Sequence, residues 1–285
     1  MKILLTGSTG QVGYELERSL QGLGEVVAVD RARMDLADLD QVRDVIRAER
    51  PQLIVNPAAY TAVDQAESDA ALAYRVNAEA PALMAQEAQA LGAKLVHYST
   101  DYVFPGGDRD ARAESDATGP LNVYGASKLA GEQAIAASGA DHLILRTSWV
   151  YGMRGKNFLL TMLRLARERD ELRIVDDQHG APTWSRTIAD TTALILARAA
   201  AGDDAWWRTH GGIYHLSSQG STTWFGFTQA ILEEAGIDCR LVPIASAEYP
   251  LPAARPRYSV LSSARLQDRF VRLPHWRDAL RLCLR

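Results

Sequence analysis

The first half of the chain alternates short apolar runs with longer alanine-rich stretches. This alternation is compatible with only a few folds. Two parallel strands need a crossover connection, usually a helix, so this pattern is typical of a parallel sheet covered by helices. The expected fold class is therefore α/β, a doubly wound parallel sheet of the Rossmann type. We predict strands at residues 3–6, 26–29, 53–56, 95–98 and 143–147, with helices at 11–21, 39–49, 66–91 and 124–137.

The second half has a different character, because turns rich in glycine and proline separate shorter elements there and five of the six tryptophans lie beyond residue 150. We expect residues 1–150 to form a dinucleotide-binding domain, joined by any later segment that returns to the sheet. Residues 151–285 are expected to form mainly a smaller mixed α/β substrate-binding lobe. Its predicted elements are helices at 158–167, 188–200 and 225–234 and short strands near 173–175 and 213–216.

Charge and composition exclude several classes of protein. The chain has 31 basic and 35 acidic side chains, a net charge of −4 without blocks of like charge, which argues against nucleic acid or an anionic membrane surface as partner. Its short apolar run at residues 3–5 leads us to expect no signal peptide, and no apolar run reaches the roughly 18 residues that a membrane-spanning helix needs. Its two cysteines, Cys239 and Cys283, form no disulfide framework or metal motif. We expect a cytoplasmic protein.

A glycine-rich turn follows the first predicted strand and opens the first predicted helix. It reads GSTGQVG over residues 7–13, a GxxGxxG pattern whose glycines let the backbone approach a pyrophosphate at a helix N-terminus. Asp30 ends the second predicted strand, where an acidic side chain can bind the adenosine ribose. We expect a dinucleotide site here. The contacts predicted in the turn are Gly7, Gly10, Gln11, Val12 and Gly13.

The identity of the dinucleotide stays open between NADPH and NADH. Asp30 favours a free ribose 2′-hydroxyl, whereas Arg31 and Arg33 are able to neutralise a 2′-phosphate, so we expect both cofactors to be accepted. Asp35 and Leu36 are expected to border the adenine. Small residues after the third strand leave room for a cofactor at the carboxyl edge of the sheet. The contacts predicted there are Ala58, Ala59 and Tyr60.

A candidate acid–base pair lies in the predicted helix at 124–137. Tyr124 and Lys128 are four residues apart, so both side chains lie on one helix face. A nearby cation stabilises a phenolate, and we expect Lys128 to lower the pKa of Tyr124 from its usual value near 10. Thr100 follows the fourth predicted strand and is placed to bond the reacting oxygen. Together they predict a catalytic set of Thr100, Tyr124 and Lys128.

These motifs together resemble the extended short-chain dehydrogenase/reductase superfamily and, within it, the dTDP-4-dehydrorhamnose reductases. The resemblance is carried by NPAAYTAVD at 56–64, STDYVF at 99–104, VYGASKLAGE at 123–132 and RTSWVY at 146–151. Further matching stretches are DQHGAPT at 177–183 and RPRYS at 255–259. The resemblance thus covers nearly the whole chain.

The resemblance implies reduction of the C4 ketone of dTDP-4-dehydro-L-rhamnose by NADPH or NADH, the last step in making dTDP-L-rhamnose. Tyr124 is then the proton donor, Lys128 also holds the nicotinamide ribose, and Thr100 orients the carbonyl. Thr100, Asp101 and Trp149 match sugar-contacting positions of the family. Arg255 and Arg257 lie in a proline-bounded loop and are candidate ligands of the substrate diphosphate, with Arg257 the one to test by mutation.

The sequence is also compared with related enzymes of different activity. Related 4,6-dehydratases have a glutamate after the Thr-Asp pair, where this chain has Tyr102, which disfavours dehydration. A reductase of another nucleotide-linked 4-keto sugar and a non-catalytic NADP-binding regulatory subunit are the two alternatives to the main prediction.

No catalytic metal is expected, although some family members assemble around magnesium, for which Glu15 and Asp190 are candidates. The expected assembly is a homodimer.

Overall fold

The computed structural model describes residues 1–107, 110–202 and 205–285. A six-stranded parallel sheet forms its centre, with the strand order β2-β1-β3-β4-β5-β10. The chain moves to β2 on one side of β1 and then returns to β3 on the other, so the direction of winding reverses beside β1. The strands are β1 (Lys2–Leu5), β2 (Glu25–Ala28), β3 (Leu53–Asn56), β4 (Lys94–Thr100), β5 (His142–Thr147) and β10 (Gly212–His215).

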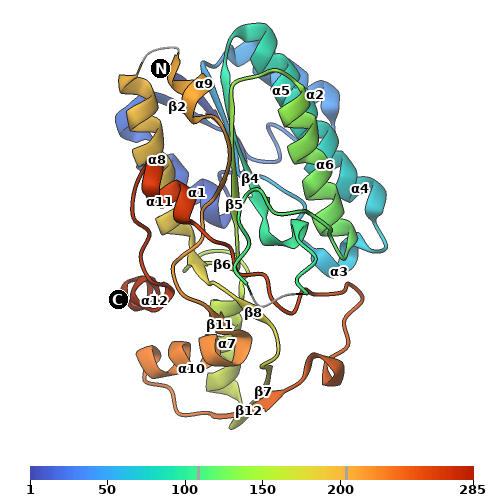
Figure 1. Ribbon diagram of the computed structural model, residues 1–285, viewed down its shortest axis with the longest axis vertical. Coiled ribbons are helices and arrows are strands. Elements are labelled where there is room, and N and C mark those ends of the chain that lie inside the picture. Colours follow the sequence, from blue (N-terminus) through green and yellow to red (C-terminus); the bar gives the residue numbers. More distant parts are fainter. Residues whose placement is uncertain (108–109, 203–204) are drawn as a thin grey trace.

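Two helical layers cover this sheet, because successive residues of its strands point to opposite faces and both faces are apolar. Leu4 and Ile54 lie in one core with α2 and α5, whereas Leu5 and Val55 lie in the other with α1 and α8. Figure 1 shows α2, α5 and α6 together on one side of the sheet, and α1, α8 and α11 on the other. Their bounds are α1 (Gln11–Ser19), α2 (Leu39–Glu49), α5 (Ala80–Leu91), α6 (Val123–Ala137), α8 (Ser185–Ala201) and α11 (Ala264–Arg269).

A second lobe lies beyond the carboxyl ends of the strands, in the lower half of Figure 1. Its own core contains Tyr151, Phe227 and Trp276, and its strands β7 and β12 pair in parallel. The other strands of the lobe, β6, β8, β9 and β11, have two residues each. The lobe is built from β6 (Val150–Tyr151), α7 (Phe158–Glu168), β7 (Glu171–Val175), β8 (His179–Gly180), β9 (Thr183–Trp184), β11 (Thr222–Thr223), α10 (Trp224–Ala235), β12 (Arg240–Ile244) and α12 (Trp276–Leu284).

The mixed α/β class and the parallel central sheet are confirmed, and the predicted strand at 213–216 takes a place different from the one expected. It is β10, which pairs in parallel with β5 and so extends the main sheet rather than the second lobe. It is preceded by α9 (Ala205–His210), whose Trp207 packs in the same core as β1 and β5. The second half of the chain therefore contributes to both parts of the molecule.

The prediction of one helix over residues 66–91 is wrong. The segment instead forms α3 (Val63–Ala66), α4 (Ala70–Tyr74), a π-helical turn η2 (Arg75–Glu79) and α5. Pro81 lies at the start of α5 and has no N–H to donate to the carbonyl of Asn77, four residues earlier. That freed carbonyl approaches Gly131 of α6 so closely that a Cβ on Gly131 would lie 2.1 Å from it. The irregular turn thus lets α6 pack tightly against η2.

This contact predicts that Gly131→Ala lowers the free energy of unfolding by about 1–3 kcal/mol, because the added methyl group overpacks a backbone contact. Urea unfolding followed by circular dichroism measures the loss. Gly22→Ala is the matched control, because a Cβ at Gly22 meets no atom within 4 Å, and it should change stability far less. Equal stability of the two variants would contradict the account of this contact.

Candidate active site

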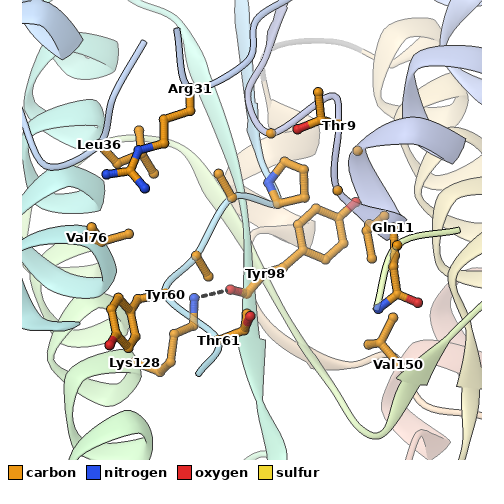
Figure 2. Close-up of a pocket in the computed structure, with 18 of the residues that line it drawn as sticks. Thr9, Gln11, Arg31, Leu36, Tyr60, Thr61, Val76, Tyr98, Lys128 and Val150 are labelled. Atoms are coloured by element: carbon orange, nitrogen blue, oxygen red, sulfur yellow. Dashed lines mark hydrogen bonds between the residues drawn. The ribbon is translucent and has the colours of Figure 1, made fainter. Parts of the chain in front are cut away.

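A cavity of about 510 Å³ lies at the carboxyl edge of the sheet, where the turns after β1, β2, β3, β4 and β5 meet. Its size is within the usual range for sites of small molecules and cofactors. Figure 2 shows Thr9 and Gln11 on one side of it and Arg31 and Leu36 on the other. The cavity is thus at the place where open α/β sheets bind their ligands.

The glycine turn forms one wall of the cavity, and its geometry requires glycine. Gly7 has a φ of 58°, and a Cβ on Gly13 would lie 2.1 Å from the carbonyl oxygen of Gly7. The turn leads directly into α1, whose first N–H groups have no partner within the helix and suit an anion. All the predicted turn residues line the cavity: Gly7, Gly10, Gln11, Val12 and Gly13.

The acidic residue expected at the ribose is not in the cavity wall. Asp30 is absent from the lining of the cavity, and its carboxylate accepts a hydrogen bond from the backbone N–H of Arg33 (3.1 Å). Arg31, Asp35 and Leu36 do line the cavity, and the Arg31 side chain bonds Asp35 at 3.1 Å while remaining mostly exposed. A backbone hydrogen bond from Ala37 lowers the pKa of Asp35. The charged groups presented to a ligand here are therefore Arg31 and Asp35.

Small residues after β3 line the floor of the cavity as expected. Ala58, Ala59 and Tyr60 are all part of its lining. The backbone of Tyr60 is held on both sides by the Asn77 side chain, which accepts from its N–H (2.8 Å) and donates to its carbonyl (3.0 Å). Asn77 also donates to the Ser127 hydroxyl on α6, so this floor is tied to the helix that carries Tyr124 and Lys128.

Tyr124 lies in the first turn of α6 and lines the cavity, whereas Thr100, its hydrogen-bond partner, is not part of the lining. Burial raises the pKa of Tyr124 to about 12, and a hydrogen bond with Thr100 acts in the opposite direction. The expectation that Lys128 lowers this pKa is not met. Burial of the phenol outweighs every other influence on it, and the Lys128 ammonium is directed elsewhere.

Lys128 is almost completely buried and bonds to the strand behind it rather than to Tyr124. Its Nζ donates to the carbonyl oxygen of Tyr98 (2.6 Å), the contact drawn in Figure 2, and lies 3.1 Å from His97 Nε2. Burial lowers the pKa of Lys128 to about 8, although the Glu132 carboxylate one turn away acts to raise it. Lys128 also lines the cavity, so it is a cation whose charge can change near neutral pH.

Two hydroxyls on the cavity wall are buried without a partner. These are Ser99 Oγ, at the end of β4, and Thr147 Oγ1, at the end of β5, and both residues line the cavity. Buried polar groups in proteins are nearly always hydrogen-bonded, so orphaned hydroxyls on two residues that line the cavity are candidate partners of a polar ligand. This fits a dinucleotide whose ribose and carboxamide groups provide donors and acceptors.

The residues expected to contact the sugar lie outside the lining of this cavity. Asp101 is buried and accepts from Thr100 Oγ1 (3.0 Å) and Ser148 Oγ (3.2 Å), and burial raises its pKa to about 6. Trp149 stacks flat on Trp224 of α10, with ring centroids 3.5 Å apart. It is one of the non-glycine residues with positive φ, at 46°.

Arg257 also lies outside the cavity lining. Its side chain is 80 % exposed and 3.9 Å from the carboxylate of Asp177. The nearby Arg255 is instead tied to Asp64 by two hydrogen bonds of 2.7 and 2.8 Å. Of the two arginines in this loop, Arg257 is therefore the one whose guanidinium remains available to an anion.

Several lining residues are absent from the sequence prediction. Ser99 and Thr147 could have been predicted from the sequence, because each lies in the last two residues of a parallel strand, at the edge where such sheets bind ligands. Gly155 and Lys156 come from a loop of the second lobe, and nothing in their spacing indicates the site. That loop is held near the glycine turn by Asn157, which donates to Gln11 (2.9 Å). The cavity residues missed are Thr9, Met34, Pro57, Thr61, Leu72, Val76, Tyr98, Ser99, Thr147, Val150, Gly155 and Lys156.

The described residues contain no cluster of three or more histidine, cysteine, aspartate or glutamate side chains arranged for a metal ion. Asp190 accepts from the Ser19 hydroxyl (2.6 Å) and lies 3.6 Å from Arg186. The prediction of magnesium at Glu15 and Asp190 stays a prediction. Within the same described ranges, every helix is too short or too polar to cross a lipid bilayer.

Comparison with known proteins shows the family of the chain. All of residues 1–285 match the family model described as RmlD substrate binding domain, and the chain belongs to this family. A dTDP-4-dehydrorhamnose reductase of Burkholderia thailandensis is 50 % identical over the whole chain and 98 % of that protein.

Solved structures agree with this family. A dTDP-4-dehydrorhamnose reductase from Clostridium acetobutylicum superposes with a TM-score of 0.93 at 35 % identity, covering 100 % of this chain and 98 % of that one. One from Bacillus anthracis, in complex with NADP, gives 0.91 at 36 % identity and covers 99 % and 98 %.

The raised pKa of Asp101 predicts a pH-dependent effect of Asp101→Asn. Above about pH 6 the folded protein buries a charge, whereas an unfolded aspartate already ionises near 3.8, so this group's stabilising contribution is lost as the pH rises through 6. An asparagine at this position does not ionise, so the variant does not lose stability in this way. Relative to wild type, the variant's free energy of unfolding should rise by about 2–3 kcal/mol between pH 4 and pH 7. Denaturant titrations at the two pH values measure it, and a pH-independent difference contradicts the assignment.

Proposed function

We propose that this member of the RmlD substrate binding domain family reduces the C4 ketone of dTDP-4-dehydro-L-rhamnose with NADPH or NADH, forming dTDP-L-rhamnose. The observation that carries the proposal is the meeting of Tyr124 and Lys128 with the glycine turn around one cavity, with Thr100 bonded to Tyr124. An acid, a cation and a pyrophosphate-binding turn at one site are what a dinucleotide-dependent reductase requires.

The residues that line the cavity are suited to a nicotinamide dinucleotide. The glycine turn and the start of α1 would hold the pyrophosphate, and Arg31, Asp35 and Leu36 would surround the adenosine end. When bound, the reduced dinucleotide supplies the hydride. Lys128 has three N–H groups as an ammonium, and two already have partners, so the third is available to a ribose hydroxyl.

Tyr124 is placed to donate the proton that the reduced carbonyl oxygen needs. A phenol with a pKa near 12 is protonated at neutral pH, so it is ready to act as an acid. The Thr100 hydroxyl would orient the carbonyl beside it. The low-dielectric surroundings that raise this pKa also strengthen the hydrogen bonds made to a developing negative charge.

Substrate contacts are assigned to the side of the site that faces the second lobe. Asp101 and Trp149 would contact the sugar, and Arg257 would bind the diphosphate, with residues 1–150 serving the cofactor and 151–285 mainly the substrate. Dehydration is disfavoured, because Tyr102 replaces the acid of the 4,6-dehydratases and burial raises its pKa further. A homodimer, a cytoplasmic location and magnesium at Glu15 and Asp190 stay predictions.

The deciding experiment follows cofactor absorbance with purified protein and dTDP-4-dehydrorhamnose, and identifies the product by mass spectrometry and NMR. We expect oxidation of NADPH or NADH and formation of dTDP-L-rhamnose. Tyr124→Phe should lower kcat about 100-fold or more while the cofactor still binds, because the ring remains and the proton is lost. Cofactor binding without oxidation would favour another 4-keto sugar or a regulatory subunit.

The position of Arg31 predicts a preference for NADPH. Its guanidinium lines the cavity, while Asp30 is turned toward the backbone of Arg33. Arg31→Ala should therefore raise the KM for NADPH about 10-fold, as loss of one charge-assisted bond would, and leave that for NADH nearly unchanged. Arg33→Ala is the control, because Arg33 pairs with Glu49 instead of lining the cavity. An equal effect of Arg31→Ala on both cofactors would refute this preference.

A further inference from the structure

A chain of buried polar side chains runs behind the candidate active site, from β1 across β3 and β4 to α6. Thr6, Asn56, His97 and Lys128 are each at most 2 % exposed. Thr6 Oγ1 donates to Asn56 Oδ1 (2.7 Å), Asn56 Nδ2 lies 3.1 Å from His97 Nδ1, and His97 Nε2 lies 3.1 Å from Lys128 Nζ. The proposed reduction assigns a role only to the last of these four residues.

Donors and acceptors along this chain are determined by its chemistry. An amide nitrogen only donates, so His97 Nδ1 must be the acceptor and the hydrogen of the neutral imidazole must be on Nε2. That N–H then points at Lys128 Nζ, which can accept it only as a neutral amine, because an ammonium has no lone pair. The arrangement seen is therefore complete when Lys128 is deprotonated.

When Lys128 is protonated, donor and acceptor must exchange in every hydrogen bond of this chain. The ammonium donates to His97 Nε2, the imidazole carries its hydrogen on Nδ1, and the Asn56 amide turns over so that its oxygen accepts from Nδ1. Its nitrogen then donates to the Thr6 hydroxyl. One proton is taken up overall, Lys128 gains it, and the imidazole remains neutral with its hydrogen on the other nitrogen.

We propose that His97 and Asn56 form a two-state relay that keeps Lys128 hydrogen-bonded whether or not it carries its extra proton. An unpartnered buried donor or acceptor costs about 1–3 kcal/mol, and a relay that reverses avoids that cost in both states. His97 and Asn56 are positioning residues, since they act on Lys128 and do not line the cavity. Their effect on catalysis rests on the proposed reductase function.

The surroundings make such a change of proton state accessible. Burial brings the pKa of Lys128 to about 8 and moves that of His97 well below its usual value, so the imidazole stays neutral near physiological pH while the lysine titrates. The Glu132 carboxylate acts to raise the pKa of Lys128, and Glu132 itself forms an ion pair with Arg146. The other charged or titratable groups on the elements around Lys128 and His97 include Tyr124 on α6, Asp101 beyond β4, and Arg75 and Glu79 on η2.

The test reads the histidine tautomer by NMR with 15N-labelled histidine, without substrate or cofactor. We expect His97 to carry its hydrogen on Nδ1 at about pH 6 and on Nε2 at about pH 10, on either side of the lysine titration. Lys128→Met should abolish this change. His142, at the start of the neighbouring strand β5, is the internal reference, because its ring bonds the carbonyl of Ala140 instead. A single His97 tautomer at every pH in wild type overturns the proposal.

A second variant tests the amide. A carboxylate only accepts, so Asn56→Asp should hold the His97 hydrogen on Nδ1 throughout the pH range. A tautomer that still changes in this variant overturns the role given to Asn56. His97→Phe should lower kcat about 10-fold or more and alter its pH profile, because Lys128 loses a partner in both states. Unchanged kinetics in a folded His97→Phe would refute the positioning role.

The outcomes separate this inference from the proposed function. A tautomer change without reduction of dTDP-4-dehydrorhamnose would leave the relay standing and reject the reductase assignment. Reduction of that substrate by a protein whose His97 keeps one tautomer would support the reductase function and reject the relay. If His97→Phe fails to fold, the wild-type spectra and Asn56→Asp still decide the matter.

Discussion

The register of the parallel strands β3, β4 and β5 is the constraint on which the site depends. Parallel pairing places Asn56, the last residue of β3, beside His97, and Thr100 and Thr147, the last residues of β4 and β5, beside each other. The turns after β1, β2 and β3 and the ends of β4 and β5 line the same cavity. Helix α6 packs over this edge of the sheet and adds two side chains from one of its faces to the cavity wall. These side chains are Tyr124 and Lys128.

Sequence patterns were sufficient for the features that depend on local chemistry. The strand at 53–56 and the helix at 39–49 are predicted to the residue, because a continuous apolar run and a helical period leave little choice. The glycine turn was also predictable, since only glycine tolerates the approach of Gly13 to Gly7. In contrast, the break in 66–91 depends on Pro81 and on a partner helix distant in sequence.

The sequence alone does not show how deeply the side chains of the site are buried. The spacing of Tyr124 and Lys128 predicted that they share a face, but the pKa of Tyr124 depends on the loss of water around it. The orientation of Asp30 is likewise set by the backbone of Arg33 and not by its position after a strand. Lys156 reaches the cavity through a loop of the second lobe, and long-range contacts of this kind leave no periodic signal in a single sequence.

The buried chain from Thr6 to Lys128 also bears on how the molecule folds. A slip of β3 by one residue against β4 would move Asn56 to the other face of the sheet and leave His97 and Thr6 without their shared amide. Apolar strands of similar length pair almost equally well in several registers, whereas these polar groups are satisfied in one. The same residues that surround Lys128 therefore penalise misaligned sheets during folding, so the native register is selected before any ligand is present.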